Sequence, residues 1–212
     1  SALFQRLPYD PDRDFVPLAM MAHQPNLFVV NPRVLPVSNI AELIEAARTR
    51  PGGVPGCSPG TASFAHINLE LLRHRAGVEM PHVGFRGSSL MLTALLAGDI
   101  PFGVDAAGTS LPLVRDGRIR ALAVGSAERL RALPDIPAVS ETLPGFDASP
   151  WYGVFAHSAT PAPVLARLDE QIRAVLALPP ETRAAMGDAA RLSVPTMEAM
   201  QVATIALYRE LL

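Results

Sequence analysis

The feature that most constrains the fold of this chain is a regular alternation of extended and helical segments between residues 55 and 124. Apolar extended runs are expected to end near residues 57, 83, 105 and 124. Between them, the sequence predicts helices at 63–75, 89–97 and 108–116. A chain that alternates in this way forms a parallel sheet whose strands are joined by right-handed crossovers. We therefore predict an α/β fold.

Further elements are expected on both sides of this region. Before it, the sequence predicts strands at 15–22 and 26–31 and a helix at 39–50. Asn39, with Glu42 three residues later, fits a capping box at the start of this helix. After an irregular, proline-rich stretch at 125–149, the sequence predicts a strand within "SPWYGVFAH", a helix at 161–177, a short helix near 181–187, a strand near 191–194 and a helix at 196–212.

Apolar side chains recur at helical spacing in several predicted helices, and such stripes are typical of packing faces. In the helix at 63–75, Phe64, Ile67 and Leu71 are placed on one face. The two later helices carry longer stripes: Val164, Leu165, Leu168, Ile172 and Val175 in one, and Met197, Met200, Thr204, Leu207, Tyr208 and Leu211 in the other.

Composition excludes several classes of function. Hydrophobic residues make up 49% of the 212 residues and charged residues 18%, which is typical of a folded globular chain. The net charge of −2 gives no electrostatic footprint for nucleic acid or an anionic membrane. A single cysteine, Cys57, excludes an internal disulfide and is interpreted as a filler at a strand end. No apolar run approaches the ~20 residues of a membrane span.

Three loops follow predicted strands and precede predicted helices: Ser58–Ser63, Phe85–Ser89 and Asp105–Thr109. In open α/β sheets, ligands bind beyond the carboxyl ends of the strands, at helix N-termini. Glycine lets the backbone approach a ligand closely, and unpaired N–H groups suit a carboxylate or phosphate. The alternative is that Ser63 and Ser88 are ordinary helix N-caps.

A nucleophilic serine is a weaker interpretation of "GCSPGTASFAHINLELL" at 56–72. Ser58 or Ser63 could be a nucleophile with His66 as base and Asp105 as its orienting carboxylate. However, Pro59 follows Ser58 directly and has no N–H to stabilise an oxyanion. A phosphate-binding loop is excluded, because no lysine follows the glycines. The histidines at 66, 74 and 82 lie eight residues apart, and we expect neither a metal nor a cofactor.

Several segments succeed one another in an order that matches a known family. The run "LPYDPDRDFVPLAMMAHQPNLFVVNP" is followed by a Ser-x-Gly-x-Gly-Ser-x-x-His pattern at Ser58, Gly60, Ser63 and His66, with Ala62 where the second glycine is usual. The run "HVGFRGS" at 82–88 fits "HVPYKGS", and "LLAGDIPFGVD" ends on Asp105. "GRIRALAVGSAERLRALPDIPAVSE" and "PGFDASPWYGVFAHSATP" come next. From about Leu7 to its C-terminus, the chain resembles the Bug solute receptors, the periplasmic substrate-binding proteins of tripartite tricarboxylate transporters.

This resemblance implies a two-lobed type II periplasmic-binding-protein fold that closes on a ligand. Residues 33–149 would form lobe two, and residues 1–32 with 150–212 the remnant of lobe one and the hinge strands. Asp105 would engage an amino or polar group of the ligand. The ligand-binding residues that the resemblance implies are Ser58, Gly60, Thr61, Ala62, Ser63, His66, Phe85, Arg86, Gly87, Ser88 and Asp105.

The resemblance also implies function and partners. The chain would be a non-enzymatic, extracytoplasmic receptor that delivers a small carboxylate, dicarboxylate or amino acid to tripartite transporter subunits. Roughly the first third of the family pattern is missing, so lobe one is expected to be incomplete and to expose apolar surface. A homodimer or a rearranged lobe would cover that surface. The alternatives are the serine hydrolase, a ligand-sensing regulatory domain, and a remnant whose clamp no longer binds.

Overall fold

The structure, a computed structural model, describes residues 8–179 and 181–183. The described chain divides into a larger unit that contains residues 22–152 and a smaller unit that contains residues 9–21 and the chain after residue 152. The strand expected near 191–194 and the helix expected at 196–212 lie outside the described residues, as does most of the short helix expected near 181–187.

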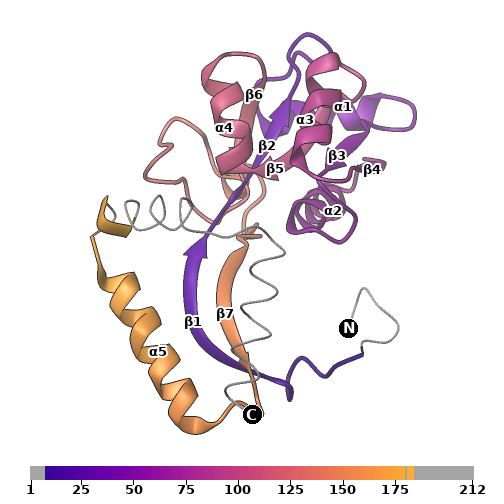
Figure 1. Ribbon diagram of the computed structural model, residues 1–212. Helices are drawn as coiled ribbons and strands as arrows, with labels where there is room; N and C mark the ends of the chain where they lie inside the picture. The colour runs from indigo at the N-terminus through magenta and orange to yellow at the C-terminus, as the bar shows by residue number, and fades with distance from the viewer. Residues whose placement is uncertain (1–7, 180, 184–212) are drawn as a thin grey trace. The chain divides into compact units, whose positions relative to one another are not determined.

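The larger unit is built on a five-stranded sheet with the strand order β4-β3-β5-β2-β6 (Figure 1). β3 pairs in parallel with β4 and β5, and β2 runs antiparallel to both β5 and β6. The α/β fold is therefore confirmed, with one antiparallel strand inside the sheet. The strands are β2 (Asn26–Val30), β3 (Gly56–Ser58), β4 (His82–Gly84), β5 (Phe102–Ala106) and β6 (Arg120–Val124).

Strand β2 lies inside the sheet of the larger unit. All five of its residues are buried, and Leu27 lies opposite Asp105 of β5 and Val124 of β6. These pairings hold β2 within the larger unit, which contains residues 22–152. They join β2 to strands far along the chain, and no local pattern encodes such partners.

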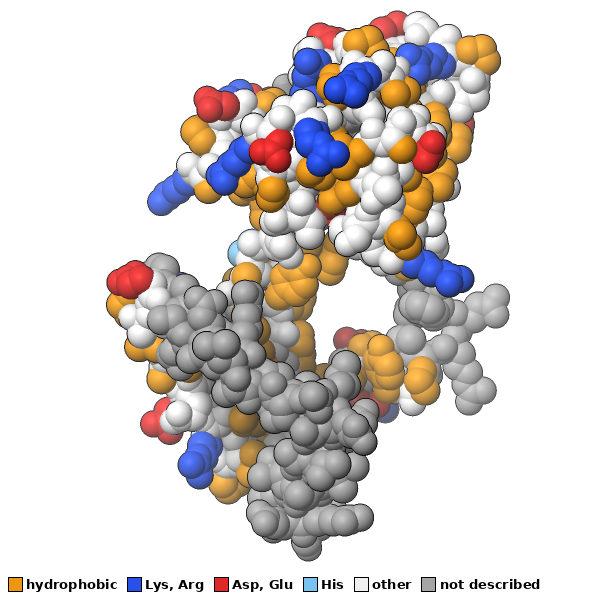
Figure 2. Space-filling view, turned by 45° about the horizontal axis from the view of Figure 1, so that its top comes forward, with side chains coloured by type: hydrophobic (Ala, Val, Ile, Leu, Met, Phe, Trp, Pro, Cys, Tyr) orange, Lys and Arg blue, Asp and Glu red, His pale blue; other side chains and the backbone are white. Residues whose placement is uncertain are grey.

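Helices cover both faces of this sheet. α1 (Ile40–Thr49) and α2 (Phe64–Ala76) pack on the face that carries Phe28 and Val30, and α3 (Ser88–Ala97) and α4 (Ala107–Arg115) pack on the face of Leu27 and Val29. Because both faces are buried, β2 is a continuous apolar run rather than an alternating one. The space-filling view shows basic and acidic side chains interspersed over the larger unit on the face that it presents (Figure 2).

The predicted cap of α1 is confirmed. The Oδ1 atom of Asn39 accepts the Glu42 N–H at 2.9 Å, and the Glu42 carboxylate accepts the Ser38 N–H at 2.7 Å. The reciprocal bond of the capping box therefore comes from the residue before the N-cap. Ile40, Leu43, Ile44 and Ala47 form the buried stripe of the helix.

Phe64, Ile67 and Leu71 lie on one side of α2, as the sequence predicts, but another side of the helix packs on the sheet. Ala65, Asn68, Leu69 and Leu72 are the buried residues of this helix, whereas Phe64 and Ile67 are 48% and 42% exposed. Phe64, Ile67 and Leu71 instead line a hollow of about 280 Å³ together with Asn68 and residues 147–149. Because α2 carries apolar residues on two sides, periodicity alone did not identify the side that packs on the sheet.

Cys57 fills the end of β3, as predicted. Its side chain is fully buried, and its Sγ atom lies 3.3 Å from the carbonyl oxygen of Phe102. Burial raises the pKa of the Cys57 thiol to about 12, so the thiol stays protonated and unreactive at neutral pH.

The smaller unit contains most of a two-stranded sheet of β1 (Phe15–His23) and β7 (Trp151–His157) and the helix α5 (Ala162–Ala177). Residues 22–23 of β1 and 151–152 of β7 belong to the larger unit. An irregular stretch with one short 3₁₀ helix, η1 (Val139–Glu141), precedes β7 and belongs to the larger unit. None of the described helices combines the length and apolarity needed to cross a lipid bilayer.

Candidate functional site

The loops predicted to carry the site lie together at the carboxyl ends of β3, β4 and β5. The Phe85 N–H donates to the carbonyl oxygen of Ser58 at 3.0 Å, and the Gly87 N–H donates to that of Pro59 at 2.7 Å. Ser88 Oγ donates to Asp105 Oδ1 at 2.7 Å, which connects the start of α3 to the end of β5. The three segments therefore form one connected edge of the sheet, as the parallel pairing of β3 with β4 and β5 requires.

The turn at residues 58–63 uses most of its own N–H groups. Gly60 N–H donates to Ser58 Oγ at 3.3 Å, Ala62 N–H to His66 Nδ1 at 3.0 Å, and Ser63 N–H to the carbonyl oxygen of Gly60 at 3.2 Å. These three groups are therefore not free for an anion. A cradle of unpaired N–H groups at this turn therefore does not include those of Gly60, Ala62 and Ser63.

Ala62 adopts a left-handed backbone conformation, with φ at 67°. A Cβ atom is disfavoured there, which explains why the resemblance has glycine at this position. Of the non-glycine residues that the structure describes, only Ala62 has a positive φ. The turn is thus strained at one point, and the hydrogen bond to His66 Nδ1 is made at that point.

Ser63 is the N-cap of α2, because its Oγ atom accepts the backbone N–H of His66 at 3.2 Å. The N-cap interpretation of Ser63 is thereby confirmed. Ser88 differs: the N-cap of α3 is Gly87, with φ at 108°, and Ser88 is the first helical residue, bonded to Asp105.

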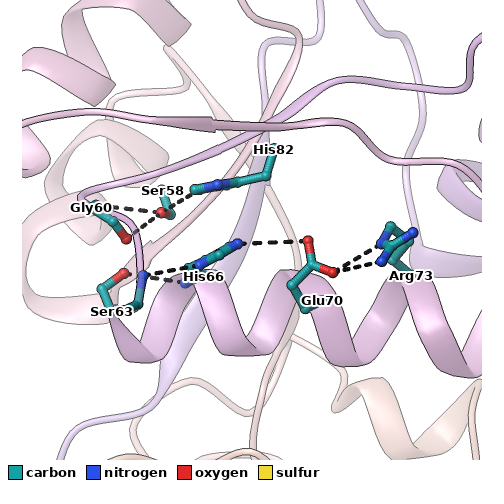
Figure 3. A network of polar contacts seen from close by, with 8 residues as sticks. Ser58, Gly60, Ser63, His66, Glu70, Arg73 and His82 are labelled. Atoms are coloured by element: carbon teal, nitrogen blue, oxygen red, sulfur yellow. Dashed lines mark hydrogen bonds and ion pairs between the residues drawn. The ribbon is translucent and has the colours of Figure 1, made fainter. Parts of the chain in front are cut away.

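Ser58 pairs with a histidine, but not with the one that the hydrolase hypothesis named. Its Oγ atom lies 2.8 Å from His82 Nε2 and donates to the carbonyl oxygen of Gly60 at 3.0 Å, and the side chain is fully buried (Figure 3). The ring of His66 contacts neither Ser58 nor Ser63: its two nitrogens face Ala62 N and Glu70 Oε1. The geometry therefore does not support His66 as the base for either hydroxyl.

The rings of His66 and His82 stack, with their centroids 3.7 Å apart and their planes 20° from parallel. His66 Nε2 lies 3.6 Å from Glu70 Oε1, and Glu70 Oε2 pairs with Arg73 Nη2 at 2.9 Å (Figure 3). Burial, and then the nearby His66, lower the pKa of His82 below its usual value. The two stacked rings thus support the turn, since each makes a hydrogen bond to it.

The loop at residues 85–88 has a more open character. Phe85 packs against the apolar cluster of α3 and α4, whereas Arg86 is exposed. A side chain at Gly87 would meet open space. Within the part of the chain that the structure describes, the backbone N–H groups of Ser88 and Ser89 have no hydrogen-bond partner. These N–H groups are the first of α3, where the helix dipole favours negative charge.

Asp105 is enclosed rather than presented to solvent. Its side chain is fully buried, Oδ1 accepts from Ser88 Oγ, and Oδ2 accepts from Thr109 Oγ1 at 2.5 Å. Burial raises the pKa of Asp105 above its usual value, against the lowering effect of the two hydroxyl groups. Asp105 therefore ties the starts of α3 and α4 together.

Four polar residues of this edge were missed by the sequence predictions of site residues: Glu70, Arg73, His82 and Thr109. Glu70 lies four residues after His66 on the same helix, so its spacing was a usable signal. Thr109 likewise follows Asp105 by four residues at the start of a predicted helix. His82 gave no such signal for Ser58, because their contact depends on the register between β3 and β4.

Comparisons with known proteins agree with this fold. A family model described as "Tripartite tricarboxylate transporter family receptor" matches residues 2–206. A UPF0065 protein from the tcbD-tcbE intergenic region of Pseudomonas sp. strain P51 is 38% identical over 178 residues, which cover 83% of this chain and 53% of that protein. The protein BugT of Bordetella pertussis is 31% identical over 176 residues, covering 82% of this chain and 54% of BugT.

Solved structures show the same similarity in three dimensions. An R. palustris protein solved with adipate has a TM-score of 0.76 and 34% identity, covering 83% of this chain and 59% of that one. MatC from Rhodopseudomonas palustris, solved with bound malate, has a TM-score of 0.72 and 30% identity, covering 82% of this chain and 60% of MatC. The expected periplasmic-binding-protein type of fold is thereby confirmed. The chain spans about half the length of the curated relatives it matches.

Proposed function

The chain belongs to the tripartite tricarboxylate transporter receptor family, and from this premise we propose that it is a solute-binding protein for a small organic acid carrying two carboxylates. The observation that carries the proposal is the pair of unpartnered N–H groups of Ser88 and Ser89 at the open start of α3, within the described residues. Similar proteins solved with adipate and with malate support a dicarboxylate as the ligand class.

In the proposed complex, one ligand carboxylate accepts from the N–H groups of Ser88 and Ser89. Gly87 leaves room for this approach, since a Cβ atom there would meet nothing within 4 Å. The exposed guanidinium of Arg86, next to this helix start, can pair with the second carboxylate in a bidentate manner. Negative charge on both ends of the ligand is thus matched by one helix terminus and one arginine.

In this proposal, the turn at 58–63 forms one wall of the ligand site and offers a few polar groups to it. Thr61 is exposed, and Gly60, Ala62, Ser63 and His66 are half-buried. Of these, Gly60 lies against the backbone of Phe85. Ser58 and Asp105 are fully buried, so in this proposal they act from behind the ligand, by fixing the turn and the start of α3. The proposal requires neither a metal nor a cofactor.

The proposal extends to location and partners by relation to the family. We place the chain in the periplasm, where it would pass its ligand to the membrane subunits of a tripartite transporter. A homodimer is the further partner that we propose, because Val164, Leu168 and Val175 of α5 are each about 40% exposed. Light scattering coupled to size-exclusion chromatography would test it: a monomeric mass at micromolar concentration would contradict the dimer.

The ligand proposal is tested by thermal shift with adipate, malate, succinate and a monocarboxylate such as acetate. We expect saturable stabilisation by at least one dicarboxylate and none by acetate at the same concentration. Arg86→Ala should weaken binding about tenfold or more, as expected for loss of a charge-assisted pair. Arg33→Ala is the matched control. Arg33 is also exposed but follows β2, which runs antiparallel to β5, so it lies at the opposite end of the strands. Stabilisation that Arg86→Ala and Arg33→Ala reduce equally would contradict the proposed site.

A further inference from the structure

The strained residue of the turn is held by a histidine whose proton arrangement the structure fixes. Ala62, at φ 67°, donates its backbone N–H to His66 Nδ1 at 3.0 Å. A backbone N–H can only donate, so Nδ1 must be unprotonated in this state. The proton of the neutral imidazole is therefore on Nε2, the atom that faces Glu70 Oε1 at 3.6 Å. The other carboxylate oxygen of Glu70 pairs with Arg73, so the Glu70 side chain is held with one oxygen toward the His66 ring.

A second histidine holds the same turn from its other end. His82 stacks on His66 at 3.7 Å, and its Nε2 contacts Ser58 Oγ at 2.8 Å. Ser58 in turn bonds to both the carbonyl oxygen and the N–H of Gly60. Among the residues that the structure describes, the charged groups that face the stacked pair are Glu70 and Arg73 of α2, and each imidazole faces the other, from α2 and β4 (Figure 3).

We propose that His66 is a positioning residue for the turn at 58–63, and that the His66–His82 stack makes the shape of this turn sensitive to protonation. For the ligand, this inference rests on the function proposed above, because the turn borders that site. The response of the turn itself to pH does not depend on any ligand.

Protonation of His66 would free the turn by removing one hydrogen bond. A proton that binds to His66 Nδ1 turns this atom from an acceptor into a donor, so that two N–H groups face each other and the hydrogen bond from Ala62 is lost. Ala62 then has no partner for the conformation that its Cβ atom disfavours, and the turn relaxes.

The matching experiment follows the Ala62 amide and the ring protons of His66 and His82 by NMR from pH 8 to pH 5.5, without ligand. In the wild type, we expect the Ala62 ¹⁵N shift to move with the titration of His66. His66→Asn offers an amide oxygen at the place of Nδ1 that cannot titrate, so the Ala62 shift should stay at its high-pH value. His66→Phe preserves the stack without an acceptor, and Ala62 should show its low-pH value throughout.

His74→Asn is the control, because His74 is exposed on the same helix, and it should leave the Ala62 titration unchanged. An Ala62 shift that does not follow His66 in the wild type, or that titrates equally in His66→Asn, would overturn the inference. For the ligand, malate is the probe: its Kd should rise about tenfold between pH 8 and pH 6 in the wild type, as expected for loss of one hydrogen bond, and less in His66→Asn measured in the same buffers. Equal rises in both proteins would overturn the link between the stack and ligand binding. If malate, adipate and succinate bind neither protein at any pH, the proposed function fails, and the Ala62 titration still decides this inference.

Discussion

The larger and smaller units of this chain differ in how far they bury their own apolar residues. In the larger unit, every residue of β2 is buried, and α1 buries four apolar side chains. In the smaller unit, no residue of β1, β7 or α5 is fully buried. The stripe of α5 nevertheless has the same helical spacing as that of α1. A periodic stripe therefore predicts a helix and the side that can pack, but not that a partner covers it.

This difference in burial indicates which of the two units can hold a binding site. A binding site needs groups that are held in place by packing around them. The edge formed by residues 58–63, 85–88 and 105–109 stands on the sheet of the larger unit, with Ser58 and Asp105 fully buried beneath it. The described part of the smaller unit shows no comparable support, since all of its residues are at least partly exposed.

The largest expected change is a loss of unfolding free energy, and it compares one leucine from each unit. Leu69→Ala, in α2, removes a fully buried side chain and should cost about 3 kcal/mol of unfolding free energy. Leu168→Ala, in α5, makes the same chemical change in a helix where the leucine is 40% exposed, and should cost less than about 1 kcal/mol. Urea unfolding followed by circular dichroism measures both. Equal losses would show that the two units are packed alike.

A second prediction concerns packing within the larger unit, at the glycine that follows β6. A Cβ atom at Gly125 would lie 2.2 Å from Asn68 Oδ1, and Asn68 is held by its bonds to the carbonyl oxygens of Phe64 and Ala148. Gly125→Ala should therefore cost about 2–3 kcal/mol through overpacking. Gly117→Ala is the control, because it meets open space and bears only the strain of φ at 68°. A larger loss at Gly117 than at Gly125 would contradict this packing.

A third prediction concerns the strained turn and has the opposite sign. Ala62→Gly should raise the free energy of unfolding by about 0.5–1 kcal/mol, because glycine accepts the left-handed conformation freely. Ala65→Gly, three residues later in α2, makes the same substitution at a buried helical position and should lower it by about 1 kcal/mol or more. Thermal unfolding of the two variants and the wild type measures both changes. Destabilisation by Ala62→Gly would show that Ala62 is not strained.

The smallest expected effect is a dependence of stability on pH. The pKa of His82 is lower in the folded chain than in the unfolded one, so the unfolded state binds the extra proton as the pH falls below the usual value of 6.5. The contribution of His82 to stability is complete above that pH and declines below it. His82→Gln should therefore flatten the fall in Tm between pH 8 and pH 5.5. An unchanged slope in this variant would assign the pH dependence to other groups.

Local signals in the sequence predicted local structure well. The start of α1 depends on Asn39 and Glu42, which lie three residues apart, and Ser63 caps α2 through the N–H of His66, also three residues away. The gathering of the three loops was also predictable, since the carboxyl ends of neighbouring parallel strands meet at one edge. These features depend on spacing along the chain or on a general rule of sheet topology.

The remaining features depend on contacts between distant segments. The place of β2 is set by its pairing with β5 and β6, and the partner of Ser58 is set by the register of β4, which brings His82 to it. The enclosure of Asp105 follows from the packing of α3 and α4 against the end of β5. No pattern within a single segment contains these facts, because each needs the tertiary arrangement to be known first.

We propose that a dicarboxylate binds at the start of α3, beside the turn at 58–63. The most direct test is a titration of the ¹⁵N-labelled chain with malate or adipate, followed by amide NMR. We expect saturable shifts that are largest at Ser88 and Ser89 and small at residues 31–35, which follow β2 at the opposite end of the sheet. Saturable shifts that are largest at residues 31–35, or no saturable shift with either acid, would rule out binding at the start of α3.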